Sequence, residues 1–189
     1  MFIQTDNTPN PNAIKFFPNV TVSPEQPVHF SSIAEAQQAS RLATQLFGIN
    51  NVKSVFFGSD FITITKEEEG DWQILKPEIL MVIMDYFTAG YEVFDLQSKE
   101  KKAKNLDSLP KIEQEIIEII ETRVRPSVAM DGGDIIYKGF NNGVVKLELR
   151  GACQGCPSSS LTLKSGIESM LKHFIPEVES VEAYSAEEE

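Results

Sequence analysis

The chain has 189 residues and a formal net charge of −11, with 28 acidic residues against 17 basic ones. Such an acidic surface repels phosphate backbones, so nucleic acid is not an expected partner. Apolar residues make up 41% of the chain, which is ordinary for a globular protein. The longest apolar run, residues 79–87, is interrupted by Asp85 and is shorter than the about 20 residues of a membrane span, so no membrane partner is expected.

The first residues show neither the basic and apolar segments of a secretory signal nor the Arg- and Ser-rich pattern of a transit peptide. We therefore expect a cytoplasmic protein of a bacterium, or a protein of the mitochondrial matrix if the chain is a processed form. Reducing conditions in either compartment disfavour structural disulfides.

A polar, charge-dense segment divides the chain into two predicted domains. Between Ser98 and Asn105, Ala103 is the only apolar residue, which is typical of a linker. We predict an N-terminal domain at 1–97, a linker at 98–108, a C-terminal domain at 109–184 and a solvated acidic tail at 185–189.

Both domains mix helices and strands. In the first, the patterns predict a strand at 13–17, a helix at 32–47, a hairpin at 52–57 and 61–65, and a helix at 72–88. Ser32 and Glu35 have the spacing of a capping box at the start of the first helix. Met81 and Met84 of the second helix are interpreted as core packing.

In the C-terminal domain the predicted order is α-β-β-α-β. The elements are a helix capped by Ser108 and closed by Pro126, a turn at 131–134, a hairpin at 135–140 and 144–149, a helix at 158–174 and a strand at 178–184. Alternation in the second strand predicts one apolar and one solvated face. These patterns predict an α+β fold in which two helices cover one face of a three-stranded sheet. Phe174 is assigned to the buried face of the second helix, and Arg125 is interpreted as a cation that stabilises the end of the first.

Cys153 and Cys156 are the only cysteines of the chain, so all its thiol chemistry lies in one loop. A Cys-x-x-Cys pair is typical of a metal half-site, a redox dithiol or a disulfide. The loop is rich in small residues and directly precedes a predicted helix N-terminus, whose N–H groups favour thiolates. Both features suit a metal ion or an iron–sulfur cluster.

The number of ligands in one chain is too small for a complete site. Structural zinc and iron–sulfur clusters commonly take four ligands. His29 belongs to the other predicted domain, and His173 lies roughly 20 Å along the following helix. A four-thiolate site at Cys153 and Cys156 therefore requires two chains, and a cluster shared at such a surface is labile, as a carrier needs.

Two alternatives remain open at this loop: a thiol–disulfide oxidoreductase, and two unreactive buried thiols, since cysteine is a common core residue, although a polar loop flanked by glycine is an unusual place for one. Cys153 as nucleophile and Cys156 as resolving thiol would make a thiol–disulfide oxidoreductase, although a thioredoxin-like fold requires more strands than this domain offers. The preceding Asp131-Gly132-Gly133-Asp134 is interpreted as a turn that needs glycine, and a role beside the cysteine loop is the alternative.

The segment Asp131-Gly132-Gly133-Asp134, the hairpin and Gly151-Ala152-Cys153-Gln154-Gly155-Cys156-Pro157 together resemble the C-terminal domain of NifU-like (Nfu-type) proteins, over residues 109–184. The start of the chain, with Thr8-Pro9-Asn10-Pro11-Asn12, resembles the N-terminal domain that accompanies this module.

The resemblance implies a non-enzymatic scaffold or carrier, dimeric when loaded. It would hold a [4Fe–4S] cluster between two subunits, receive it from an upstream donor and pass it to apo-proteins. A [2Fe–2S] core also takes four thiolates, so the choice of [4Fe–4S] depends on the resemblance. The N-terminal domain has no cysteine, and client recognition is its expected role.

Overall fold

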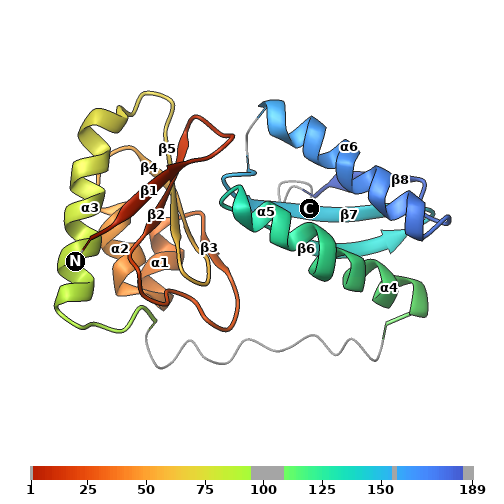
Figure 1. The fold of residues 1–189 in the computed structure, drawn as a ribbon, viewed down its shortest axis with the longest axis horizontal. Coiled ribbons are helices and arrows are strands. Elements are labelled where there is room, and N and C mark those ends of the chain that lie inside the picture. Colours follow the sequence, from red (N-terminus) through yellow and green to blue (C-terminus); the bar gives the residue numbers. More distant parts are fainter. Residues whose placement is uncertain (1, 95–108, 155–156, 185–189) are drawn as a thin grey trace. The chain divides into compact units, whose positions relative to one another are not determined.

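The computed structural model describes residues 2–94, 109–154 and 157–184, without the side chains of 157–162 (Figure 1). It divides into two compact units, Met1–Lys102 and Ala103–Glu189, which are described separately below as the N-terminal and C-terminal units. The predicted linker at 98–108 and the acidic tail at 185–189 lie outside the described residues. Within the described part of the chain, no helix has the length and apolar character needed to cross a membrane.

The N-terminal unit is built on a five-stranded antiparallel sheet with the strand order β1-β2-β5-β4-β3. Its strands are β1 Gln4–Asn7, β2 Ala13–Phe17, β3 Val28–Phe30, β4 Val52–Phe57 and β5 Ile62–Lys66. The three central strands are those that the sequence predicts. The edge strands β1 and β3 escape prediction because β1 is polar and largely exposed and β3 has only three residues.

The predicted helix at 32–47 is wrong as a single element. It is two helices, α1 Ile33–Ala39 and α2 Arg41–Phe47, separated by Ser40 in an extended conformation with φ −152°. The Ser40 hydroxyl accepts a hydrogen bond from the Ala43 N–H at 3.3 Å and donates one to the Val93 carbonyl at 2.5 Å. The break therefore caps α2 and ties it to a segment 53 residues further along the chain.

The N-cap of α1 is confirmed, because the Ser32 hydroxyl accepts a hydrogen bond from the Glu35 N–H at 3.4 Å. The reciprocal half of the capping box is shifted by one residue. The Glu35 carboxylate accepts from the N–H and the hydroxyl of Ser31, at 2.8 and 3.0 Å, one residue before the cap.

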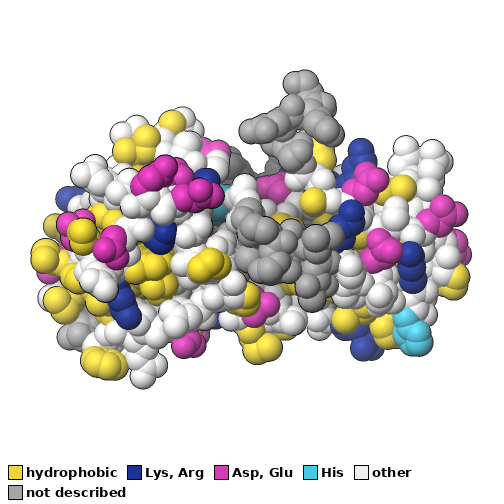
Figure 2. Space-filling view, turned by 90° about the horizontal axis from the view of Figure 1, so that it is seen from above, with side chains coloured by type: hydrophobic (Ala, Val, Ile, Leu, Met, Phe, Trp, Pro, Cys, Tyr) yellow, Lys and Arg dark blue, Asp and Glu magenta, His cyan; other side chains and the backbone are white. Residues whose placement is uncertain are grey.

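The third helix, α3 Trp72–Thr88, has the predicted bounds. It packs on the N-terminal core through residues spaced three or four apart: Leu75, Ile79, Ile83 and Tyr86. Met81 and Met84 lie off this stripe and are 58% and 40% exposed, so the prediction that they pack in the core is wrong. Figure 2 shows hydrophobic side chains on the surface of the N-terminal unit, with acidic side chains among them.

The C-terminal unit has the predicted α-β-β-α-β order. Its elements are α4 Lys111–Ile119, the π-helical turn η3 Ile120–Val124, α5 Arg125–Met130, β6 Gly133–Asn141, β7 Val144–Gly151, α6 Pro157–Phe174 and β8 Ser180–Ala183. The strands form one sheet of order β6-β7-β8, antiparallel between β6 and β7 and parallel between β7 and β8. The expected α+β class and the three-stranded sheet are confirmed.

The start of the first C-terminal helix differs from the prediction. Pro110 is itself the N-cap of α4 and makes no side-chain capping bond, and the predicted cap Ser108 lies outside the described residues. Proline suits this position because its missing N–H would have no helical partner there.

The predicted end of that helix at Pro126 is wrong, because the helix continues to Met130. In the π-helical turn the Arg125 N–H donates to the Ile120 carbonyl five residues back, so one extra residue is inserted before the proline. Pro126 then falls in the first turn of α5, where a proline is tolerated.

One face of the C-terminal sheet carries the core. Ile135, Val145 and Leu147 of the hairpin are buried there, together with Ile120 of the first helix and Leu171 of α6. Figure 1 shows α4–α5 and α6 running along the sheet. Both helices thus contribute to one core on one face of the sheet, as the sequence predicts.

The hairpin turn and the last residue of α6 lie at the margins of this core. The hairpin turns at Asn142 and Gly143, with φ +49° and +78°, the left-handed pair of a type I′ turn, so the predicted turn is confirmed. Phe174 is 45% exposed at the last residue of α6, with the Arg123 guanidinium 4.6 Å from its ring, so its assignment to the core is wrong.

Candidate metal centre

Cys153 lies in the turn that follows β7 and is only 4% exposed. Its sulfur rests against Gly133, the first residue of β6. A Cβ atom at Gly133 would lie 2.5 Å from Cys153 Sγ and 2.7 Å from the Arg150 carbonyl, both closer than real contacts allow. The absence of a side chain at residue 133 therefore makes the space in which the thiol lies.

The glycine turn and the cysteine loop are joined through the backbone. Gly132 has φ +82°, and its carbonyl accepts a hydrogen bond from the Ala152 N–H at 3.2 Å. Gly133 is paired with Gly151 at the end of the β6–β7 ladder. The predicted turn at 131–134 is confirmed, and it lies beside the cysteine loop, as the alternative interpretation required.

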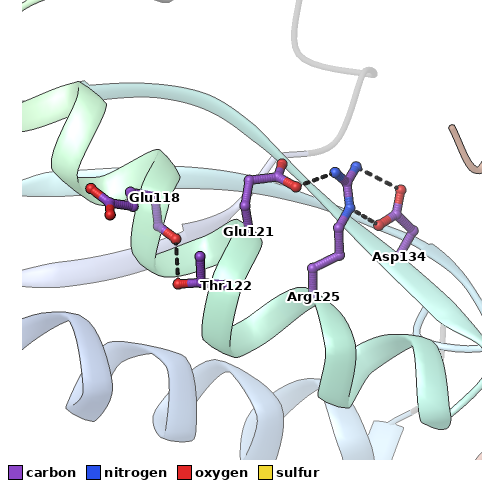
Figure 3. Close-up of polar contacts among 5 residues, drawn as sticks. All are labelled: Glu118, Glu121, Thr122, Arg125 and Asp134. Carbon is purple, nitrogen blue, oxygen red and sulfur yellow. Dashed lines mark hydrogen bonds and ion pairs between the residues drawn. The ribbon is translucent and has the colours of Figure 1, made fainter. Parts of the chain in front are cut away.

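Arg125 holds the other side of this turn (Figure 3). Its guanidinium donates from Nε to Asp134 Oδ1 at 2.7 Å and from Nη2 to Asp134 Oδ2 at 3.2 Å, and it donates from Nη1 to Glu121 Oε2 at 2.5 Å. The two-pronged contact is the geometry in which arginine binds carboxylates most strongly. The Asp134 side chain is 3% exposed and that of Arg125 is 30% exposed, so the carboxylate is buried while the arginine side chain reaches solvent in part.

Electrostatics keep Arg125 charged in this position. Burial by itself lowers the pKa of the guanidinium, but the hydrogen bonds and charges of Asp134 and Glu121 outweigh it and raise the pKa. Glu121 lies four residues before Arg125, and the two side chains form an ion pair.

Sequence reasoning missed this cluster. Arg125 was expected to be a helix-end cation, whereas it lies inside a continuing helix. Asp134 follows two glycines at the start of a strand, and no local pattern marks it as buried. Arg125 and Asp134 come together only because α5 packs beside β6 in the folded unit.

The described residues complete no metal site by themselves. Cys156 lies outside them, and α6 begins at Pro157, directly after the loop. His173 is exposed in the last turn of α6, with its ring 4.9 Å from that of Phe174, and His29 lies in β3 of the other unit. Among described residues, no group of three or more His, Cys, Asp or Glu side chains could hold a metal ion.

The donors at the loop fit a soft metal. Thiolates suit iron–sulfur clusters and zinc, whereas carboxylates prefer hard cations. Of the two carboxylates of the glycine turn, that of Asp134 is already bound to Arg125. The sequence therefore offers two thiol donors in one motif, Cys153 and Cys156, and the described one, Cys153, lies against Gly133.

Two family models match the chain in succession. The model described as "Scaffold protein Nfu/NifU N terminal" matches residues 3–90, and the "NifU-like domain" matches residues 116–182. A solved NMR structure of a NifU-like protein from Saccharomyces cerevisiae is 31% identical, covers 53% of this chain and 87% of its own, and has a TM-score of 0.46.

Full-length relatives cover nearly the whole chain. The "NFU1 iron-sulfur cluster scaffold homolog, mitochondrial" of Homo sapiens is 50% identical over 183 residues, which are 96% of this chain and 71% of the relative. The protein of the same name from Drosophila virilis is 46% identical over 182 residues, 96% of this chain and 61% of the relative. The chain thus spans between about three fifths and seven tenths of the length of these relatives. On these matches, the chain belongs to the Nfu/NifU family of scaffold proteins.

Proposed function

We propose that this protein is an iron–sulfur cluster scaffold and carrier, in which Cys153 and Cys156 bind half of a [4Fe–4S] cluster and a second copy of the chain binds the other half. The observation that carries the proposal is that both thiols of the chain belong to one Cys-x-x-Cys motif, and that the described one, Cys153, lies against Gly133 at the end of the sheet. The family to which the chain belongs and the names of its relatives support the same function.

The proposed dimer follows from the number of ligands. A four-thiolate cluster needs two more donors than one loop supplies, and no other cysteine exists in the sequence. A [2Fe–2S] cluster would need the same four thiolates. The preference for [4Fe–4S] comes from the resemblance of the cysteine motif to Nfu-type domains.

Transfer of the cluster would be a ligand exchange. Thiolates of an apo-protein replace Cys153 and Cys156 on the cluster, so the protein needs no catalytic group and is not an enzyme. Because Cys153 is 4% exposed in the described conformation, its side chain must become accessible before a cluster can enter or leave. An upstream donor and the apo-proteins are the expected partners.

The N-terminal domain would recognise client proteins. It has no cysteine, and the outer face of α3 carries exposed Ile74 and Met81, with Glu78 and Asp85 exposed beside them. An apolar, acidic face of this kind suits a client segment that carries both apolar and basic side chains. Replacement of Ile74 and Met81 by Gln is expected to weaken binding of a client without loss of the cluster.

The proposed compartment is a reducing one, either the bacterial cytoplasm or the mitochondrial matrix. The relatives named above are mitochondrial by name, which supports the second. Either compartment keeps Cys153 and Cys156 available as thiols.

A thiol–disulfide oxidoreductase remains the second candidate. The parallel pair β7 and β8, joined by α6, places the loop between a strand and a helix, as in redox dithiols. The sheet of the described C-terminal unit has only three strands, fewer than a thioredoxin-like fold requires. This observation favours the carrier, whereas the burial of Cys153 does not separate the two functions, because either one needs the thiol to become accessible.

Anaerobic reconstitution with iron and sulfide separates the two functions. The carrier is expected to become brown, to bind one cluster per two chains and to shift from monomer to dimer in size-exclusion chromatography. Cys153→Ala is expected to abolish cluster retention while circular dichroism stays unchanged. A colourless monomer that reduces insulin disulfides efficiently would contradict the carrier and support the oxidoreductase.

A further inference from the structure

A continuous set of contacts leads from the first helix of the C-terminal unit to the cysteine thiol. Arg125 makes its two-pronged contact with Asp134 (Figure 3). Asp134 follows Gly133 directly, and Gly133 is the residue against which Cys153 Sγ lies. A change in the position of Asp134 therefore moves the seat of the thiol.

Asp134 is held in this position by Arg125. Its carboxylate is 3% exposed, and both of its oxygens accept hydrogen bonds from the guanidinium. A buried carboxylate that loses its partner must reach water or another donor, because an uncompensated buried charge is strongly unfavourable. Without Arg125, the first residues of β6 would have to shift to solvate Asp134.

The helix geometry fixes Arg125 in turn. Arg125 closes the π-helical turn through its backbone N–H, and Glu121 binds the guanidinium from the side opposite Asp134 (Figure 3). Single-turn π-helices occur often at functional sites.

We infer that Arg125 is a positioning residue of the cysteine loop: its ion pair with Asp134 fixes Gly133 and thereby keeps the Cys153 thiol seated in the cluster-free protein. The inference concerns the loop that the proposed function uses, and it deepens that function by naming what holds one cluster ligand in place. Arg125 itself does not touch the cluster.

The rate of alkylation of Cys153 tests this inference without any cluster. In a Cys156→Ala background Cys153 is the only thiol of the full chain, so iodoacetamide reports on that residue alone. Arg125→Gln is expected to raise the alkylation rate at least about tenfold, because the thiol is released from a buried site that now opens more often. Asp134→Asn is expected to have the same effect.

The double variant and matched controls identify the ion pair as the cause. Arg125→Gln combined with Asp134→Asn should raise the rate no further than either change alone, since both remove one interaction. Lys138→Gln breaks a different ion pair of the same strand, Lys138–Glu148, and should leave the rate within about twofold of the parent. A similar rise in that control would mean general loosening of the strand and would overturn the inference.

If Arg125→Gln unfolds the domain, two variants that weaken the contact without removing it can replace it in the test. Arg125→Lys keeps the charge but loses the two-pronged contact, and Glu121→Gln removes only the outer contact. Each is expected to give a rate between those of the parent and Asp134→Asn, measured where circular dichroism shows a folded protein. Parental rates in every folded variant would overturn the inference.

The alkylation result is independent of cluster binding. If the rates change as expected and the protein takes up no iron or sulfide, the proposed function fails and the positioning role of Arg125 stands. If a cluster is bound and the alkylation rates do not change, the function stands and the positioning role fails.

Discussion

The two units of the molecule reach stable packing in different ways. The N-terminal unit fills the space around its five-stranded sheet with large aromatic side chains, and Phe16, Phe56 and Phe57 are fully buried. The largest fully buried side chains described in the C-terminal unit are aliphatic, namely Ile116, Ile120, Ile135 and Leu171. Its sheet ends in glycines at the point where the thiol lies.

This difference predicts which kind of substitution each unit tolerates least. An aromatic core tolerates little loss of volume, because truncation leaves a cavity. Gly133 tolerates little added volume, because a side-chain atom at that position would overlap with the sulfur of Cys153. The unit with the cysteines should therefore be the more sensitive to added atoms, and the other unit the more sensitive to removed ones.

The largest expected effect is in the aromatic core. Phe57→Ala removes a fully buried ring that packs edge-on against Phe30 at 5.4 Å and against Phe94 at 5.9 Å, and should cost about 3–5 kcal/mol of unfolding free energy. Each unit has its own hydrophobic cluster, so we expect two transitions in a urea titration, of which only the N-terminal one moves. Equal shifts of both transitions would refute the separation of the two cores.

The next largest effect is expected at Gly133, which lies against the sulfur of Cys153. Gly133→Ala places a Cβ 2.5 Å from Cys153 Sγ and 2.7 Å from the Arg150 carbonyl, and should cost about 2–3 kcal/mol in the C-terminal transition. Gly139→Ala is the matched control in the same strand, because nothing lies within 4 Å of the Cβ it adds. That variant should stay within about 0.5 kcal/mol of the parent. Similar costs for the two glycines would show that strand propensity, not the thiol, sets the penalty.

Strong periodic patterns made most of the fold predictable. The helix at 72–88 and the central strands of both sheets were recognised because their apolar residues repeat at helical or alternating spacing. The Asn142-Gly143 turn was recognised because its residues suit left-handed backbone angles. These are local signals, and tertiary contacts agree with them.

The errors occur where a tertiary contact overrides the local signal. Ser40 breaks a helix because its hydroxyl bonds a distant carbonyl, and Pro126 lies within a helix because a π-helical turn precedes it. At the candidate site, the motif predicts Cys153 as a ligand, which stays a prediction, and it predicts the glycine turn, which the structure confirms. The contact between Gly133 and the thiol and the pairing of Arg125 with Asp134 depend on how the strands return beside each other, which no local pattern specifies.

A smaller effect is expected at Ser40. Ser40→Ala removes the cap of α2 and the hydroxyl that donates to Val93, and it leaves that carbonyl without this donor in a buried region. The cost should be about 1–2 kcal/mol, seen in the N-terminal urea transition alone. A stability unchanged by the substitution would mean that water replaces the hydroxyl at both contacts.

The smallest expected effect is a pH dependence confined to the C-terminal unit. Burial raises the pKa of Glu148, but hydrogen bonds from Arg150 at 2.6 Å and Lys138 at 2.5 Å, together with their charges, outweigh it and lower the pKa below the ordinary value. A carboxylate with a lowered pKa stabilises the fold above its unfolded-state pKa, and this contribution is lost as the pH falls through the folded-state pKa.

Glu148→Gln removes this contribution. The C-terminal transition of the variant should therefore depend less on pH on the acid side, with a difference from the parent of less than about 1 kcal/mol at neutral pH, since the three side chains are partly exposed. The N-terminal transition should have the same pH profile in both proteins. If the acid-side slope of the C-terminal transition is unchanged, the pair of cations does not hold Glu148 ionised, and the polar face of β7 contributes nothing specific to the stability of the unit that carries the thiols.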